Sequence, residues 1–284
     1  MRSLGVDVGV RKGLDLVLLD DPSAPVETAR RVEVGRLASL IGEWGPDVVA
    51  IDAPPAWGSG NGSRRTEREL RRFGIQSYGT PAGGEREDHP FYEWMRVGFQ
   101  VFAAAAEAGF PRYGSGPVRG HAIEVFPHAT AVTLAGCLPP AGSGKREFRE
   151  SVLRSQRVPV KGLRSQDQVD AALAALTGLL ALRGRSTALG DPREGVIVLP
   201  VAALPARPFR RCPRTPTGPD LQPRFPGMTP CACGDPQCRQ MTSREFAPGH
   251  DAKRKSMLWA TARQGQEATD ELRRRGWELP PEMR

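Results

Sequence analysis

Apolar positions up to residue 204 follow patterns that predict short strands separated by helices. Short runs rich in β-branched residues predict strands at 3–9, 14–20, 27–34, 47–52, 121–127 and 194–200. The first three follow one another closely and predict an antiparallel meander, and the last is expected to close the sheet as an edge strand. Helical spacing predicts helices at 35–44, 64–72, 91–108, 145–155 and 166–182. This order of elements indicates an α/β fold.

Two of the predicted strands carry an aspartate where an apolar residue would be expected. Asp7 lies within a strand between Gly5 and Gly9, and Asp52 ends an apolar run that Pro54 stops. A buried carboxylate is costly unless a cation or a donor pairs with it. Asp7 is therefore either a cap or turn residue at a strand end or a metal-binding carboxylate.

Two further segments place acids beside apolar runs. Glu124 lies within a β-rich segment, where it would pair with an arginine or join Asp7 and Asp52. Ser165 and Gln168 match a capping box that opens an apolar helix. Asp167 and Asp170 share one face of this helix. Asp167 fits a simple interaction with the helix dipole, whereas Asp170 lies deeper against the apolar run.

The segment from residue 57 to 88 differs in composition and is rich in Gly, Arg, Glu and Ser. Its helix at 64–72 carries Arg64, Arg68 and Arg71. These side chains form either a solvated charged face or a surface that holds a phosphate backbone. Trp94, at the start of the next helix, is expected to pack in the core rather than to stack on a base.

Length and composition limit the protein class. The chain has 284 residues, 39% of them hydrophobic, with 27 Pro and 32 Gly. This allows one large domain, expected at 1–204, with an appendage. No apolar run reaches the length of a membrane span, and the N-terminus lacks a signal-peptide pattern. We therefore expect a cytoplasmic protein that does not bind membranes.

The net charge of +8 is concentrated near the C-terminus. Residues 205–284 carry fifteen Lys and Arg against nine Asp and Glu. Such an excess favours contact with phosphate or another acidic partner, and plain solubility is the alternative reading.

Residues 205–284 divide into a Pro- and Arg-rich linker at 205–230 and a basic, Cys- and His-rich segment at 231–284. Clustered thiols in a cytosolic chain favour a metal over disulfides. We expect one structural Zn²⁺ held by Cys231, Cys233, Cys238 and His250. Cys212 is the reserve candidate for the fourth ligand. Unligated thiols are the alternative. Cys137, in an apolar context, is expected to be a core thiol.

Basic residues follow the expected zinc ligands. Lys253, Arg254 and Lys255 lie on a predicted helix, where they suit contact with a nucleic-acid backbone. A protein-interaction module is the main alternative for this segment.

The acidic positions together resemble a known superfamily. Asp7 in GVDVG, Asp52 in AIDAPP, Glu124 in AIEVFP and Asp170 in DQVDAAL resemble the acidic set of ribonuclease H-like proteins. More closely, residues 1 to about 201 resemble the family called domain of unknown function 429, predicted nucleases of that fold. The stretch 64–74, Lys145 with Arg149 and Leu153, and the ending GDPREGVIVLP also resemble its pattern. The Asp167–Asp170 pair is similar to the last helix of Holliday-junction resolvases.

The resemblance implies a ribonuclease H-like mixed sheet with flanking helices and a metal-dependent nuclease acting on DNA or RNA. Two Mg²⁺ or Mn²⁺ ions held by carboxylates would activate water and neutralise the phosphate. Asp7 would bridge the ions, Asp52 and Glu124 would each complete one shell, and Asp170 would close the second with Asp167. Lys145 would contact the nucleic acid. Resolvase-like enzymes act as dimers, so a homodimer is also implied.

Two other functions remain open. Sugar kinases and actin-like ATPases also begin with a GxDxG strand, but Ser or Thr normally follows its second glycine. Here Val10, Arg11 and Lys12 follow instead, and no second phosphate loop is evident. The other alternative is a nucleic-acid-binding module that keeps the fold without turnover. Metal-dependent cleavage would separate a nuclease from both.

Overall fold

The computed structural model describes residues 1–21, 24–59, 62–83, 88–213, 229–230, 241–242, 254–255, 258 and 266–279. The chain divides into two compact units, Met1–Arg214 and Thr215–Arg284. Among the described residues, no helix is long and apolar enough to cross a lipid bilayer.

A seven-stranded mixed sheet forms the centre of the first unit, in the order β3-β2-β1-β4-β5-β7-β6. Its strands are β1 (Ser3–Asp7), β2 (Leu14–Asp21), β3 (Ala24–Val32), β4 (Val48–Asp52), β5 (Ala122–Glu124), β6 (Thr187–Asp191) and β7 (Gly195–Leu199). Strands β1, β2 and β3 pair antiparallel, as the predicted meander requires. Strands β1, β4, β5 and β7 run parallel to one another. The predicted α/β class is confirmed, with a mixed sheet.

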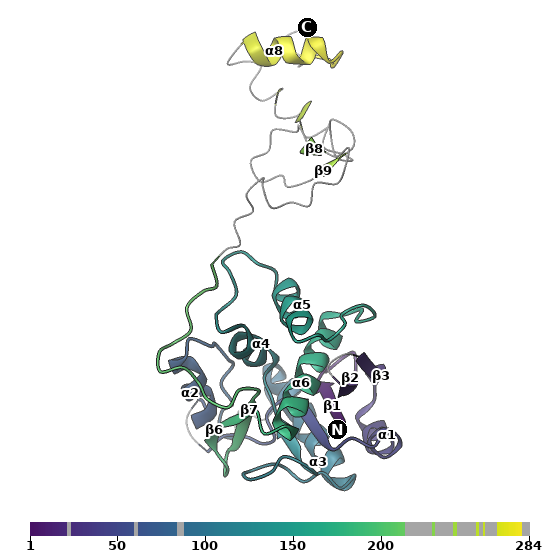
Figure 1. Cartoon of the computed structure of the whole chain (residues 1–284), viewed down its shortest axis with the longest axis vertical. Helices are drawn as coiled ribbons and strands as arrows, with labels where there is room; N and C mark the ends of the chain where they lie inside the picture. Colours follow the sequence, from purple (N-terminus) through teal and green to yellow (C-terminus); the bar gives the residue numbers. More distant parts are fainter. Residues whose placement is uncertain are drawn as a thin grey trace. The chain divides into compact units, whose positions relative to one another are not determined.

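Helices cover both faces of this sheet (Figure 1). They are α1 (Leu37–Trp44), α2 (Arg65–Arg72), α3 (Glu93–Glu107), α4 (Pro127–Ala135), α5 (Lys145–Ser155) and α6 (Gln166–Leu182), with 3₁₀ turns η1 (Val34–Arg36) and η2 (Pro90–Tyr92). Side chains of α1 and α3 share one apolar core with β1, β2 and β4. Helices α4, α5 and α6 share another core on the opposite face.

Helix α6 lies directly on the central strand, and small residues allow this close approach. A Cβ atom at Gly5 of β1 would collide with the backbone of α6 at Ala171. A Cβ at Gly178 would similarly meet the Ser3 side chain. Because α6 packs this closely, its first turn lies near the end of β1 that carries Asp7.

The start of α6 follows the expected cap in part. The Ser165 hydroxyl accepts a hydrogen bond from the Gln168 backbone nitrogen at 3.0 Å. The Gln168 side chain accepts from the backbone nitrogen of Arg164 at 2.7 Å, rather than from that of Ser165. The helix therefore begins where the sequence predicts, with the capping interaction moved by one residue.

Two elements differ from the predictions. Strand β7, expected at the edge, is an inner strand, because β6 pairs with it on the outside. The edge strand β6 has only partly buried or exposed residues and so gives no apolar run. Helix α4 was not predicted because it begins at Pro127, directly after a β-rich stretch.

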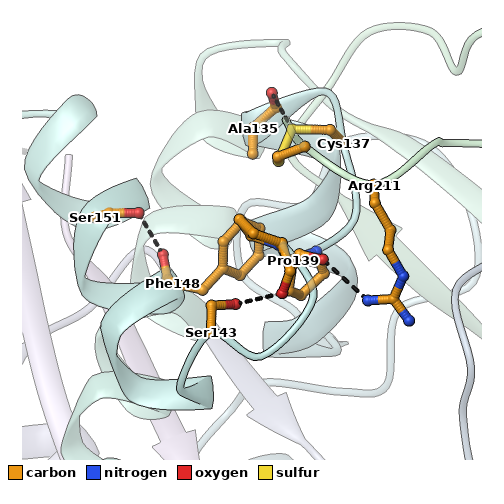
Figure 2. The surroundings of a disulfide bond; sticks show 9 residues. Ala135, Cys137, Pro139, Ser143, Phe148, Ser151 and Arg211 are labelled. Atoms are coloured by element: carbon orange, nitrogen blue, oxygen red, sulfur yellow. Dashed lines mark hydrogen bonds between the residues drawn. A yellow bond between two sulfur atoms is a disulfide. The ribbon is translucent and has the colours of Figure 1, made fainter. Parts of the chain in front are cut away.

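Residues 205–213 belong to the first unit and pack on the rest of it, although they were expected to begin an extended linker. The Leu138 backbone donates to the Arg210 carbonyl oxygen at 2.8 Å, and the Phe209 backbone donates to Phe73 at 3.0 Å. Figure 2 shows a disulfide between Cys137 and Cys212 at this place. It corrects two predictions, since Cys137 is not a core thiol and Cys212 is not available as a zinc ligand.

Reducing this disulfide should lower the free energy of unfolding by about 2–4 kcal/mol, because the bond closes a loop between residues 75 positions apart. Denaturant unfolding of the full chain with and without dithiothreitol measures the difference. A double variant, Cys137→Ser with Cys212→Ser, should unfold at the lower midpoint in both conditions. A wild-type midpoint that is unchanged after reduction, with the freed thiols counted, would contradict the expectation.

The described part of the second unit contains β8 (Thr229–Pro230), β9 (Met241–Thr242) and α8 (Gln266–Arg274). Leu258 and Leu272 are buried together. Arg254, expected to contact nucleic acid, pairs with Glu271 at 2.6 Å. The expected zinc ligands Cys231, Cys233, Cys238 and His250 lie outside the described residues, as does Lys253. The zinc site therefore stays a prediction.

Candidate functional site

Asp7 and Asp52 end neighbouring parallel strands at the same edge of the sheet. They are direct partners in the β1–β4 register. Residues in register on adjacent strands point to the same face, so the two carboxylates lie side by side. The carboxyl-terminal edge of parallel strands is where α/β sheets place functional side chains. Asp52 ends its strand as the sequence predicts, whereas Asp7, expected inside a strand at 3–9, is the last residue of β1.

Electrostatics around these two acids favour the protonated form. Burial, and then the charges of Asp52, Asp170 and Asp167, raise the pKa of Asp7 to about 9. Burial, followed by the charge of Asp170, raises the pKa of Asp52 to about 8, although Arg149 and Lys145 oppose the shift. No ion pair among the described residues involves Asp7 or Asp52. When both are ionised, the two carboxylates therefore repel each other, with no ion-paired cation among the described residues.

Asp170 of α6 belongs to the same acidic group, but it already has cationic partners. Its carboxylate accepts a short hydrogen bond from the Arg149 guanidinium and lies 3.5 Å from the Lys145 ammonium nitrogen. Gln166 donates to it at 2.8 Å. Asp167, one helical turn away and one-third exposed, lies 3.6 Å from the ammonium nitrogen of Lys12. Lys145 and Arg149 of α5 therefore neutralise one carboxylate of the group.

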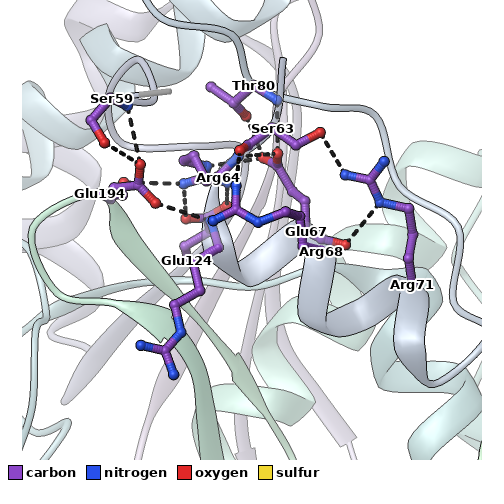
Figure 3. Close-up of polar contacts among 10 residues, drawn as sticks. Ser59, Ser63, Arg64, Glu67, Arg68, Arg71, Thr80, Glu124 and Glu194 are labelled. Atoms are coloured by element: carbon purple, nitrogen blue, oxygen red, sulfur yellow. Dashed lines mark hydrogen bonds and ion pairs between the residues drawn. The ribbon is translucent and has the colours of Figure 1, made fainter. Parts of the chain in front are cut away.

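Glu124 ends β5 and is bound by a buried arginine (Figure 3). Both of its carboxylate oxygens accept from Arg64, at 2.6 and 2.8 Å. Burial raises the pKa of Glu124, and the charge of Arg64 opposes this. This is the arginine pairing that the sequence left open. Asp7 and Asp52, by contrast, have no arginine partner among the residues that the structure describes.

Arg64 is held from two sides and is only 1% exposed. Its Nε atom donates to Glu67 at 2.9 Å, and Glu67 in turn accepts from the Thr80 backbone at 2.9 Å. Burial lowers the pKa of Arg64, but Glu124 and Glu67 outweigh it and raise the pKa above its ordinary value. This placement differs from the expected contact with a phosphate backbone, because the guanidinium is enclosed by carboxylates.

The turn between β6 and β7 completes the surroundings of Arg64. Glu194 accepts from the backbone nitrogens of Ser59, at 3.1 Å, and Arg65, at 3.0 Å (Figure 3). Gly195 has a φ of +106°, and a Cβ there would lie 3.0 Å from an Arg64 nitrogen. A side chain at Gly195 would crowd the buried Arg64–Glu124 pair, which accounts for the glycine at the end of the GDPREG segment.

Arg68 and Arg71 remain on the exposed side of α2. Their side chains donate to Ser63, to its carbonyl oxygen from Arg68 and to its hydroxyl from Arg71. Figure 3 shows both guanidinium groups beside Ser63. Both residues are therefore exposed, and their contact with an anionic partner stays a prediction.

A cavity of about 320 Å³ adjoins Asp52. Its walls combine aromatic and apolar groups with charged ones: Val8, Asp52, Ala53, Pro54, Arg64, Glu67, Ser77, Tyr78, Thr80, Trp94, Glu124, Val125, Phe126, Lys145, Arg149 and Ile197. Trp94, expected to pack in the core, lines this cavity instead. The cavity brings together α2, α3, α5 and the ends of β4 and β5.

His128 at the start of α4 is a nearby group that the sequence did not single out. Burial, and then the charges of Arg149 and Lys145, lower its pKa to about 4. The imidazole is therefore neutral near pH 7. Its ring packs against Phe126, with 5.9 Å between centroids. The sequence around His128 does not mark it as a functional residue. Its proximity to Arg149 arises only when the chain folds.

The donor set of Asp7 and Asp52 suits a hard divalent cation such as Mg²⁺, which prefers carboxylate oxygens. Within the described ranges, no three acidic, His or Cys side chains are grouped closely enough to hold a metal ion. Asp170 and Glu124 are instead turned to arginines. The fit to a metal therefore rests on Asp7 and Asp52, for which the described part of the chain supplies no ion-paired cation.

A family model described as "Protein of unknown function (DUF429)" matches residues 5–194. None of the curated proteins matches the chain. Among solved structures, RuvC of Thermus thermophilus is 17% identical, with a TM-score of 0.37, over 65% of this chain and 97% of that chain. A T. thermophilus RuvC in complex with a Holliday junction substrate is 18% identical, with a TM-score of 0.38, over 65% of this chain and 96% of that chain.

Proposed function

The chain belongs to the DUF429 family, whose description states no function, and we propose that it is a ribonuclease H-like, metal-dependent nuclease. The observation that carries the proposal is the pair of partly buried carboxylates at the ends of β1 and β4, which have raised pKa values and no ion-paired cation among the described residues. A bound cation would favour the ionised form of both carboxylates and so offset the cost of their burial. Perturbed carboxylates beside a cavity are typical of functional sites.

Asp7 and Asp52 would hold the metal, with Asp170 as the third carboxylate. When bound, divalent ions supply an activated water and positive charge at the phosphate. Glu124 has a different role in this proposal, because Arg64 occupies both of its oxygens. It fixes α2 against β5 and so shapes the cavity beside Asp52.

Lys145 and Arg149 would bind the phosphate of the substrate. Both line the cavity, and both now contact Asp170. An entering phosphate would compete for these two cations and so free Asp170 to complete the metal site. His128 stays neutral beside them and would add no charge.

A panel of labelled DNA and RNA substrates tests this function. Single strands, duplexes and junctions are incubated with the full chain in Mg²⁺ or Mn²⁺, with EDTA as the control. We expect cleavage of at least one substrate with metal and none in EDTA. Cleavage that persists in EDTA would contradict the proposal.

A non-catalytic nucleic-acid-binding domain is the second candidate. It is favoured by the arginine partners of Glu124 and Asp170, which satisfy two of the four acids without a metal. Binding to the panel without cleavage in either metal would support this candidate over the first.

A further inference from the structure

The wall of the cavity beside Asp52 combines two chemically different kinds of side chain. Tyr78, Trp94 and Phe126 contribute aromatic rings to its wall, while Lys145 and Arg149 contribute cations. The Arg64–Glu124 pair, with Glu67 and Thr80, forms another part of the wall (Figure 3). Mostly apolar cavities with a few convergent polar groups are typical of small-ligand sites.

Among the aromatic side chains of the cavity wall, Tyr78 is 69% exposed to solvent. This ring lies 5.6 Å from Phe91, also exposed, and 6.4 Å from Trp94. Among the described residues, the other exposed large hydrophobic side chains are those of Met1 and Val10. Two exposed aromatic rings in contact at the mouth of a cavity therefore mark a binding surface. Flat rings of this kind bind nucleobases by stacking.

Two polar groups of the cavity wall have no hydrogen-bond partner within the described structure. The Arg149 Nε atom is buried without a hydrogen-bond acceptor, and the residue is only 5% exposed. The Ser77 hydroxyl, also on the cavity wall, is likewise buried without a partner. Unpaired buried donors are costly, so each is expected to meet a ligand or a bound water. A phosphate oxygen would suit Arg149, and a base edge would suit Ser77.

The volume of about 320 Å³ suits one nucleotide and is too small for a stacked duplex. We propose that this cavity binds a single unpaired nucleotide of the substrate, with its base against Tyr78 and Trp94 and its phosphate at Lys145 and Arg149. This places the phosphate next to Asp52. The proposal rests on the proposed function and specifies its substrate class, which is a strand with at least one base out of the duplex.

Binding without turnover tests the proposal. Fluorescence anisotropy is measured with the full chain in EDTA, using a short fluorescein-labelled single strand and the same strand fully paired. The single strand should bind at least about tenfold more tightly. Tyr78→Leu should weaken single-strand binding about tenfold, the size of one stacking contact. Tyr78→Phe keeps the ring and should bind within about twofold of wild type.

A second pair of variants tests the role of the cations in the cavity wall. Lys145→Ala should weaken single-strand binding, whereas Lys161→Ala, on the exposed loop after α5, should not. Circular dichroism checks that each variant is folded. Equal affinity for single strand and duplex, or no loss in Tyr78→Leu, would overturn the proposal. Because no metal is present, binding without later cleavage would overturn only the nuclease function, and cleavage with equal binding of duplex would overturn only this inference.

Discussion

Asp7→Asn and Asp52→Asn should each lower metal-dependent cleavage by at least about a hundredfold, because each removes a charged ligand from the proposed metal site. Asp47→Asn provides the matched control. Asp47 precedes β4 at its other end, where it accepts from the Arg2 backbone at 2.8 Å, far along the strand from Asp52. Rates are measured on whichever substrate the wild-type protein cleaves. Equal activity in Asp52→Asn and wild type would contradict the assignment.

Asp7→Asn should also stabilise the metal-free protein. The pKa of Asp7 rises from an ordinary 3.8 to about 9 on folding. Below the lower value both states hold the proton, so Asp7 has no effect. Between the two values the folded state holds a proton that the unfolded state has released, and the free energy of unfolding falls as pH rises.

At pH 8, replacing this carboxylate by the neutral Asn should therefore raise the free energy of unfolding, by about 1–3 kcal/mol. At pH 4 the two proteins should differ little. Thermal unfolding in EDTA at both pH values measures this. A destabilised Asp7→Asn at pH 8 would show that the carboxylate is held by a structural partner.

Arg64→Met should destabilise the first unit by about 3–5 kcal/mol, because it leaves the buried carboxylates of Glu124 and Glu67 without their cation. The adjacent Arg65→Met is the control. Arg65 pairs with Glu69 at 2.7 Å, but its side chain is 59% exposed, so solvent screens the pair and its loss should cost far less than that of Arg64. Urea unfolding of both variants measures the difference. Similar losses in the two would show that the buried pair adds no special stability.

The strand-end position of Asp52 could be predicted because a strand-end carboxylate is a local signal, whereas Asp7, expected inside a strand at 3–9, ends β1. An acid inside an apolar run, followed by glycine or proline, marks a strand end in the sequence itself. The two strands then pair in register, which brings the acids together. The start of α6 could be predicted for the same reason, since Ser165 and Gln168 are neighbours along the chain.

Partners that are far apart in the sequence could not be predicted. Arg64 and Glu124 are 60 residues apart, and nothing near either residue specifies the other. Cys137 and Cys212 meet only because residues 205–213 return to the first unit. The cavity likewise joins Tyr78 and Trp94 to Arg149 of α5. In each case the tertiary fold selects the partner from several that the sequence allows.

Titration of Mn²⁺ into the metal-free protein tests most directly whether Asp7 and Asp52 form a cation site. Calorimetry near neutral pH is performed in two buffers of different ionisation enthalpy. Because the pKa values of Asp7 and Asp52 are raised to about 9 and about 8, Mn²⁺ must displace protons from them. We expect binding with proton release in the wild type and at least about tenfold weaker binding in Asp52→Asn. Absence of Mn²⁺ binding, or equal binding without proton release in both proteins, would contradict the account.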